Sequence, residues 1–188
     1  SIAVGYHETL NLTVLFSDIR GFTTIAERMP PAKLLTMLNS YFTALSEPIH
    51  QHEGFIDKFI GDAIMAIFDG PQHAFNAVNA AVAMQEALSK WNQTENKSLR
   101  SGIGLHSGEV VIGTVGTESR MDSTVLGDSV NLAARLEGLT KEHGHPILAS
   151  HSTLSLATAQ GDVLWQAYPL GTTIVKGRSE VVEYYKIY

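Results

Sequence analysis

The order of strand and helix signals along the chain is the feature that most restricts its fold. An apolar, β-branched run predicts a strand over 10–16, and an apolar stripe at helical spacing predicts a helix over 31–49. Two short strands over 55–60 and 63–68 follow, joined by a tight hairpin, and a second helix covers 74–91. This order predicts an α+β fold: a ferredoxin-like βαββαβ core with extra strands, in which the helices pack on one face of a mainly antiparallel sheet.

The rest of the chain adds further elements to this core. Pro48 should kink the first helix or mark its end. We expect a pair of strands around Ser107-Gly108, a helix from Asp128 to about Lys141, and three more strand signals. The strand pair covers 103–106 and 110–115, and the further signals lie near Ile147, near Leu164 and over 181–187.

Length and charge limit what the chain can be. Its 188 residues suit one domain, 1–188, and a start at Ser1 leads us to expect a piece of a longer multidomain protein. The chain contains no cysteine, which excludes disulfides and thiolate metal sites. A net charge of -6 argues against binding nucleic acid. With no membrane-length apolar run and no secretory signal, we expect a cytoplasmic domain without membrane contact, which a missing segment could anchor.

Three segments carry candidate chemistry. Asp18, at a predicted strand end, is followed by Gly21 and a predicted helix start, an arrangement that suits a metal-bound phosphate. Asp62, in the hairpin, could lie beside Asp18, and two carboxylates that meet require a bridging cation. Asn131 and Arg135 are four residues apart on one helix face and could clamp an anion. Each segment alone is also explained by a helix cap, a turn or a solvated helix face.

Together these segments resemble the catalytic domain of class III adenylyl and guanylyl cyclases, from about Leu12 to the C-terminus. The resemblance implies conversion of ATP to 3',5'-cyclic AMP and pyrophosphate in second-messenger signalling. It also implies two Mg²⁺ ions, for which Mn²⁺ can substitute, and a homodimer with two shared sites. The roles it assigns are metal binding for Asp18, Asp62 and the Ile19 carbonyl; base recognition for Lys58 and Thr124; ribose orientation and transition-state stabilisation for Asn131 and Arg135; phosphate binding for Lys176 and Arg120; and further substrate contacts for Phe22 and Thr23.

The base-recognition pair favours adenine. Lys58 can only donate, which suits the acceptor at adenine N1 and opposes the donor at guanine N1. Thr124 can accept from the adenine amine, although its hydroxyl can also donate. The alternatives are a guanylyl or dual-specificity cyclase, a non-catalytic nucleotide-binding module of this type, and a polymerase-like or diguanylate-type enzyme, whose Gly-Gly-Asp/Glu-Glu/Asp-Phe signature is absent. The sequence leaves the general base open between Asp18 and a metal-bound hydroxide.

Overall fold

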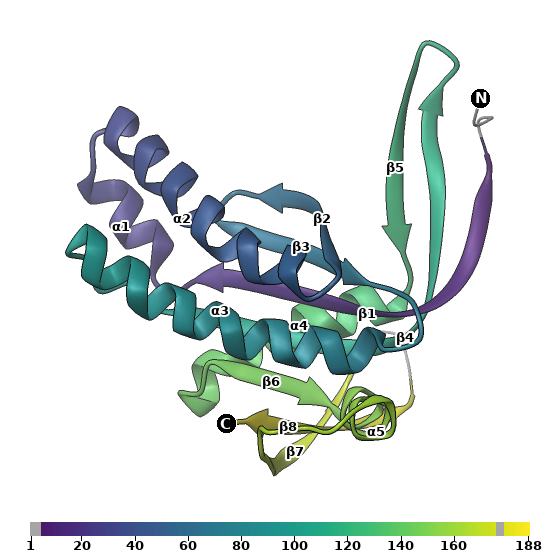
Figure 1. The fold of residues 1–188 in the computed structure, drawn as a ribbon. Coiled ribbons are helices and arrows are strands. Elements are labelled where there is room, and N and C mark those ends of the chain that lie inside the picture. The colour runs from purple at the N-terminus through teal and green to yellow at the C-terminus, as the bar shows by residue number, and fades with distance from the viewer. Residues whose placement is uncertain (1–4, 176–178) are drawn as a thin grey trace.

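The computed structural model describes residues 5–175 and 179–188 as one mixed sheet with helices on both of its faces (Figure 1). The elements, in chain order, are β1 (His7–Ile19), α1 (Phe22–Arg28), α2 (Pro31–Gln51), β2 (Gly54–Ile60), β3 (Ala63–Phe68), α3 (His73–Glu95), β4 (Ser101–Thr117), β5 (Arg120–Leu126), α4 (Asp128–His143), β6 (Ile147–Ser150), α5 (His151–Gln160), β7 (Ala167–Ile174) and β8 (Val181–Ile187). None of these helices combines the length and the hydropathy needed to cross a bilayer.

The predicted ferredoxin-like core is confirmed. It consists of β1, α2, β2, β3, α3 and β4, and its strands lie in the order β2-β3-β1-β4 with antiparallel neighbours throughout. The sheet continues through β6, β8 and β7, and β4 and β6 form its parallel pair. The extra strands thus extend the core sheet at the β4 edge.

The prediction that the helices cover one face is correct for α2 and α3 but wrong for α4. Leu15 and Ile19 of β1 pack with α2 and α3, whereas Leu12 and Val14 face the opposite layer, which includes Ala133 of α4. Figure 1 shows α3 and α4 on opposite sides of the sheet. The cause is the alternation of side chains along a strand, which gives β1 two apolar faces to cover.

Two glycines of β4 allow α4 to lie very close to the sheet. A Cβ atom on Gly104 would overlap the backbone of Ala133 and Glu137, and one on Gly102 would overlap the Thr140 hydroxyl. Residues with side chains at these positions would push the helix away. Gly102 and Gly104 therefore set the distance between α4 and β4.

Several expectations for the second half need correction. The predicted strand pair around Ser107-Gly108 is the single strand β4, because both residues continue the pairing with β1. Gly108 serves close packing, since a Cβ there would overlap Ser129 of α4. Leu164 lies outside any strand and is 97% exposed. Pro48 lies within the last turn of α2, three residues before its end, and β5, β7 and α5 were not predicted.

Candidate active site at the end of β1

The first candidate residue, Asp18, is the penultimate residue of β1. The chain then turns through Gly21, whose φ of 65° favours glycine, and α1 begins at Phe22 as predicted. Asp18 is half-buried, and its Oδ1 is buried with no N–H donor among the described residues. A buried carboxylate oxygen without an N–H partner is poorly satisfied, so this atom is suited to a cation that arrives with a ligand.

Asp62 reaches the same place from the β2–β3 hairpin. Gly61 and Asp62 are the two residues between the paired Ile60 and Ala63, and the φ of 59° at Gly61 fits such a turn. The Oδ2 atom of Asp62 accepts a 2.8 Å hydrogen bond from the backbone N–H of Ile19. The hairpin therefore brings Asp62 to the end of β1, as the sequence predicted.

The two carboxylates influence each other electrostatically. Burial raises the pKa of Asp62, the hydrogen bond from the Ile19 amide lowers it, and the charge of Asp18 raises it. Repulsion of this kind is relieved when a cation lies between the two groups. The Asp18–Asp62 pair is thus arranged to bind a cation.

Glu137 of α4 is a third carboxyl group near this site, and the sequence analysis missed it. It is 9% exposed, and its pKa is raised to about 9 by burial, by a hydrogen bond with Asp18 and by the charge of Asp18. A glutamate in an amphipathic helix suggests the solvent face. The available signal was its position four residues after Ala133 and three before Thr140, which places it on a buried stripe.

The residues assigned to the base lie on strands at the margin of the sheet. Lys58 is on β2, at one end of the strand order, and its Nζ lies 3.5 Å from Oδ2 of Asp57. Thr124 is half-buried on β5, which pairs with β4 outside the main strand order.

Asn131 and Arg135 are exposed on α4, on the side away from its buried leucines. Arg135 Nε donates a 3.4 Å hydrogen bond to Oγ1 of Thr173 on β7. Arg120 is exposed at the start of β5, where it pairs with Thr117 of β4. The structure thus places all three on the surface.

The remaining assigned residues divide between core, surface and undescribed chain. Phe22 is half-buried and packs against the cluster under α2 and α3, whereas Thr23 is exposed. Lys176 lies outside the described residues.

The donor set at the end of β1 fits a hard divalent cation. It offers the Asp18 and Asp62 carboxylates and the Ile19 carbonyl, and oxygen atoms are the ligands that Mg²⁺ prefers. Within 5–175 and 179–188, no cluster of three or more His, Asp or Glu residues forms a ready metal cage. A cation here would therefore complete its coordination with water or substrate oxygens, which is usual for Mg²⁺ bound with phosphates.

The fold and the site have counterparts among known proteins. The profile of the family described as "Adenylate and Guanylate cyclase catalytic domain" matches residues 4–187. An adenylate cyclase of Anabaena cylindrica is 40% identical over 195 residues, covering 100% of this chain and 38% of the relative. Adenylate cyclase 1 of Rhizobium meliloti is 37% identical over 184 residues, covering 94% of this chain and 27% of the relative. The chain thus spans well under half the length of these relatives.

Solved structures resemble the chain over nearly its whole length. The adenylyl cyclase CyaB from P. aeruginosa superposes with a TM-score of 0.85 and 34% identity, covering 97% of this chain and 96% of that one. The guanylyl cyclase Cya2 superposes with a TM-score of 0.81 and 34% identity, covering 98% and 94%.

Proposed function

Because the chain belongs to the adenylate and guanylate cyclase catalytic domain family, we propose that it converts ATP to 3',5'-cyclic AMP and pyrophosphate. The observation that carries this proposal is the meeting of Asp18 and Asp62 at the end of β1, where the N–H of Ile19 fixes Asp62 and Asp18 Oδ1 is buried without an N–H donor. The named adenylate cyclases at 37–40% identity favour the same product.

The reaction is an attack of the ribose 3' oxygen on the α-phosphorus, with pyrophosphate as the leaving group. Asp18, Asp62 and the Ile19 carbonyl would hold two divalent ions, Mg²⁺ or Mn²⁺, which neutralise the phosphate oxygens when bound. The protein otherwise contributes by positioning the ribose and the phosphates. Asn131 and Arg135 would do so from the exposed side of α4.

The separation of the assigned residues supports a site shared between two subunits. Asp18 and Asp62 are gathered at one end of β1, whereas Lys58, Thr124, Asn131 and Arg135 lie elsewhere on the surface and at the sheet margins. We infer that a two-fold homodimer joins the carboxylates of one chain to these residues of its partner, so that two equivalent sites form. The exposed apolar side chains of β2, β4 and β5 provide surface for that contact: Phe55, Phe59, Ile60, Val115, Met121 and Leu126.

Adenine is the preferred base in this proposal. Lys58 is a donor on an accessible strand, with a side chain 41% exposed, and it complements the adenine N1 acceptor. GTP is the second candidate substrate. The chain resembles the guanylyl cyclase Cya2, and the hydroxyl of Thr124 can donate as well as accept a hydrogen bond.

Product identification by mass spectrometry, after incubation with ATP or GTP and Mg²⁺ or Mn²⁺, tests the proposal. Cyclic AMP is expected, and failure to form either cyclic nucleotide would refute it.

A further inference from the structure

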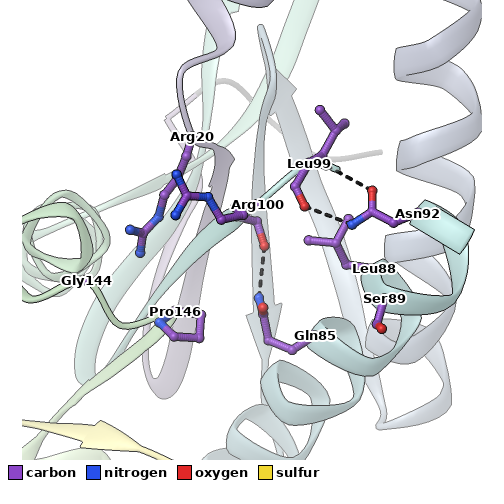
Figure 2. Close-up of a pocket in the computed structure, with 10 residues that line it drawn as sticks. Arg20, Gln85, Leu88, Ser89, Asn92, Leu99, Arg100, Gly144 and Pro146 are labelled. Carbon is purple, nitrogen blue, oxygen red and sulfur yellow. Dashed lines mark hydrogen bonds between the residues drawn. The ribbon is translucent and has the colours of Figure 1, made fainter. Parts of the chain in front are cut away.

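A hollow of about 270 Å³ with a mixed polar and apolar lining lies beyond the end of β1, between α3 and the connection from α4 to β6 (Figure 2). Its polar lining comes from the turn after β1, from α3 and from the start of β4: Arg20, Gln85, Ser89, Asn92, Arg100 and Ser101. None of the residues assigned to the nucleotide or the metals lines it. We call it the Arg20–Arg100 pocket.

Two arginine side chains converge on this pocket. Figure 2 shows the guanidinium groups of Arg20 and Arg100 on the same side of it. Their backbones are joined by a 2.8 Å hydrogen bond from the Arg20 N–H to the Arg100 carbonyl. The pocket therefore holds two like charges at neighbouring positions.

The described residues neutralise this charge only in part. Arg20 Nη2 donates to the carbonyls of Thr140 (3.1 Å) and His145 (3.0 Å), and its Nε is buried without an acceptor. Glu137, when it is ionised, and Asp18 attract Arg20 from the side of the metal site. For the exposed Arg100, the described part of the chain provides no ion pair.

The walls of the pocket are held in place by hydrogen bonds of their own. The amide of Asn92 donates to the Leu99 carbonyl (2.9 Å) and accepts from the Leu99 N–H (3.0 Å), which fixes the residue before Arg100 (Figure 2). Gln85 Nε2 donates to Ser101 Oγ at 2.9 Å, on the other side of Arg100. Such support lowers the entropy that binding must overcome.

We propose that the Arg20–Arg100 pocket binds a phosphate group, distinct from the phosphates of the nucleotide. Arg100 can offer a planar pair of donors and Arg20 keeps the donors of its Nη1, and phosphate carries the double negative charge and the oxygens to accept from both. The ligand is either inorganic phosphate or a phosphate monoester. The apolar side chains of Leu88, Leu99 and Pro146, which also line the pocket, leave room for an organic substituent.

Isothermal titration calorimetry of the purified chain with inorganic phosphate tests this site, in metal-free chloride buffer of constant ionic strength. The wild-type chain should show saturable binding, and Arg100→Gln should weaken it roughly tenfold or more, since a charge-assisted contact is lost. Arg100→Lys keeps the charge without the planar fork and should fall between the two. Arg28→Gln removes an equal charge from the exposed end of α1 and should bind like wild type.

The same titration of Arg135→Ala separates this pocket from the nucleotide site. Phosphate binding that survives Arg135→Ala and is lost in Arg100→Gln supports the proposal. The reverse pattern, unchanged affinity in Arg100→Gln, or no saturable binding to the wild-type chain would overturn it. Glycerol 3-phosphate then identifies the source: tighter binding than inorganic phosphate indicates a monoester, and equal or weaker binding indicates the free ion. Failure of cyclase activity would leave this result unaffected.

Discussion

The carboxylate of Asp62 is held against β1 by the backbone N–H of Ile19, whose own carbonyl is an expected metal ligand. One peptide segment therefore orients the hairpin carboxylate and also offers an oxygen beside it. The register of β1 against β3, which pairs Ser17 with Ile64, brings the hairpin to this position. The distance between the two carboxylates thus depends on strand pairing more than on side-chain flexibility.

Replacing Asp62 tests the metal assignment with little change in shape. Asp62→Asn keeps an oxygen that can accept from the Ile19 N–H but removes the negative charge, so turnover with Mg²⁺ should be abolished while the circular dichroism spectrum is unchanged. Asp162→Asn, at an exposed position after α5, is the matched control and should keep wild-type turnover. Near-normal activity of Asp62→Asn would rule out Asp62 as a metal ligand.

Replacing Lys58 tests base recognition. Lys58→Glu exchanges a donor for an acceptor that suits guanine N1–H, so kcat/KM should fall for ATP and rise for GTP. The cost of a mispaired buried group is on the order of 1–3 kcal/mol, or roughly 5- to 150-fold in kcat/KM. Steady-state kinetics with both nucleotides measure the ratio, and an unchanged ATP:GTP preference would remove Lys58 from the pocket.

Mixing two inactive variants tests the shared site. Arg135→Ala should lower kcat by roughly 10²–10³, and Asp18→Ala should abolish turnover. In a two-fold homodimer that exchanges subunits freely, half of the dimers are mixed and each has one intact site, which gives roughly a quarter of wild-type activity. The assay follows confirmed subunit exchange. Mixed dimers without activity would show that each chain builds its own site.

The buried His73 should make the free energy of unfolding fall in acid. It is 7% exposed, lies 2.7 Å from the Thr13 hydroxyl, and has a pKa lowered from 6.5, first by burial. Below pH 6.5 the unfolded chain therefore binds more protons than the folded chain at this residue, so the free energy of unfolding falls as the pH falls. Urea unfolding between about pH 7 and 5 should show a steeper loss for wild type than for His73→Gln. His50→Gln, on an exposed position of α2, should keep the wild-type slope.

The close approach of α4 to β4 predicts opposite effects at two glycines. Gly104→Ala would force a Cβ atom into the backbone of Ala133 and Glu137, and should lower the free energy of unfolding by about 1–3 kcal/mol or more. Gly138→Ala, within α4 and with nothing near its Cβ position, should raise it by about 0.5–1 kcal/mol. Urea unfolding measures both, and equal stabilities would show that α4 can shift without cost.

Local patterns in the sequence predicted the core because each of its elements has a clear period or turn signal. The apolar stripe of α3 and the Gly61-Asp62 hairpin are local features, and both occur as expected. The roles of Asp18 and Arg135 came from the resemblance to a known family, because hydrophobic periodicity says nothing about them. These roles, like those of Lys58 and Thr124, remain predictions.

The failures occur where a distant partner decides the conformation. Ser107-Gly108 suggests a turn, but β1 pairs with these residues and α4 needs the space at Gly108, so the strand continues. Glu137 suggests a solvent-exposed helix face, but the absence of side chains at Gly102 and Gly104 buries it. Both effects depend on contacts between segments far apart in the chain, which a local period does not contain.

Helix α4 has two chemically different sides within two turns. Glu137 contacts Asp18 of the same chain, while Arg135 and Asn131 face outward, where the proposed partner would present its nucleotide. A rigid helix packed without a gap on Gly104 can shift only as a unit. In the proposed dimer, a shift of α4 caused by substrate at Arg135 would also move Glu137 beside the Asp18 that serves the other site, so we expect the two sites to influence each other. Nucleotide binding in one site would then change the affinity of the other site, because each α4 helix contributes to both.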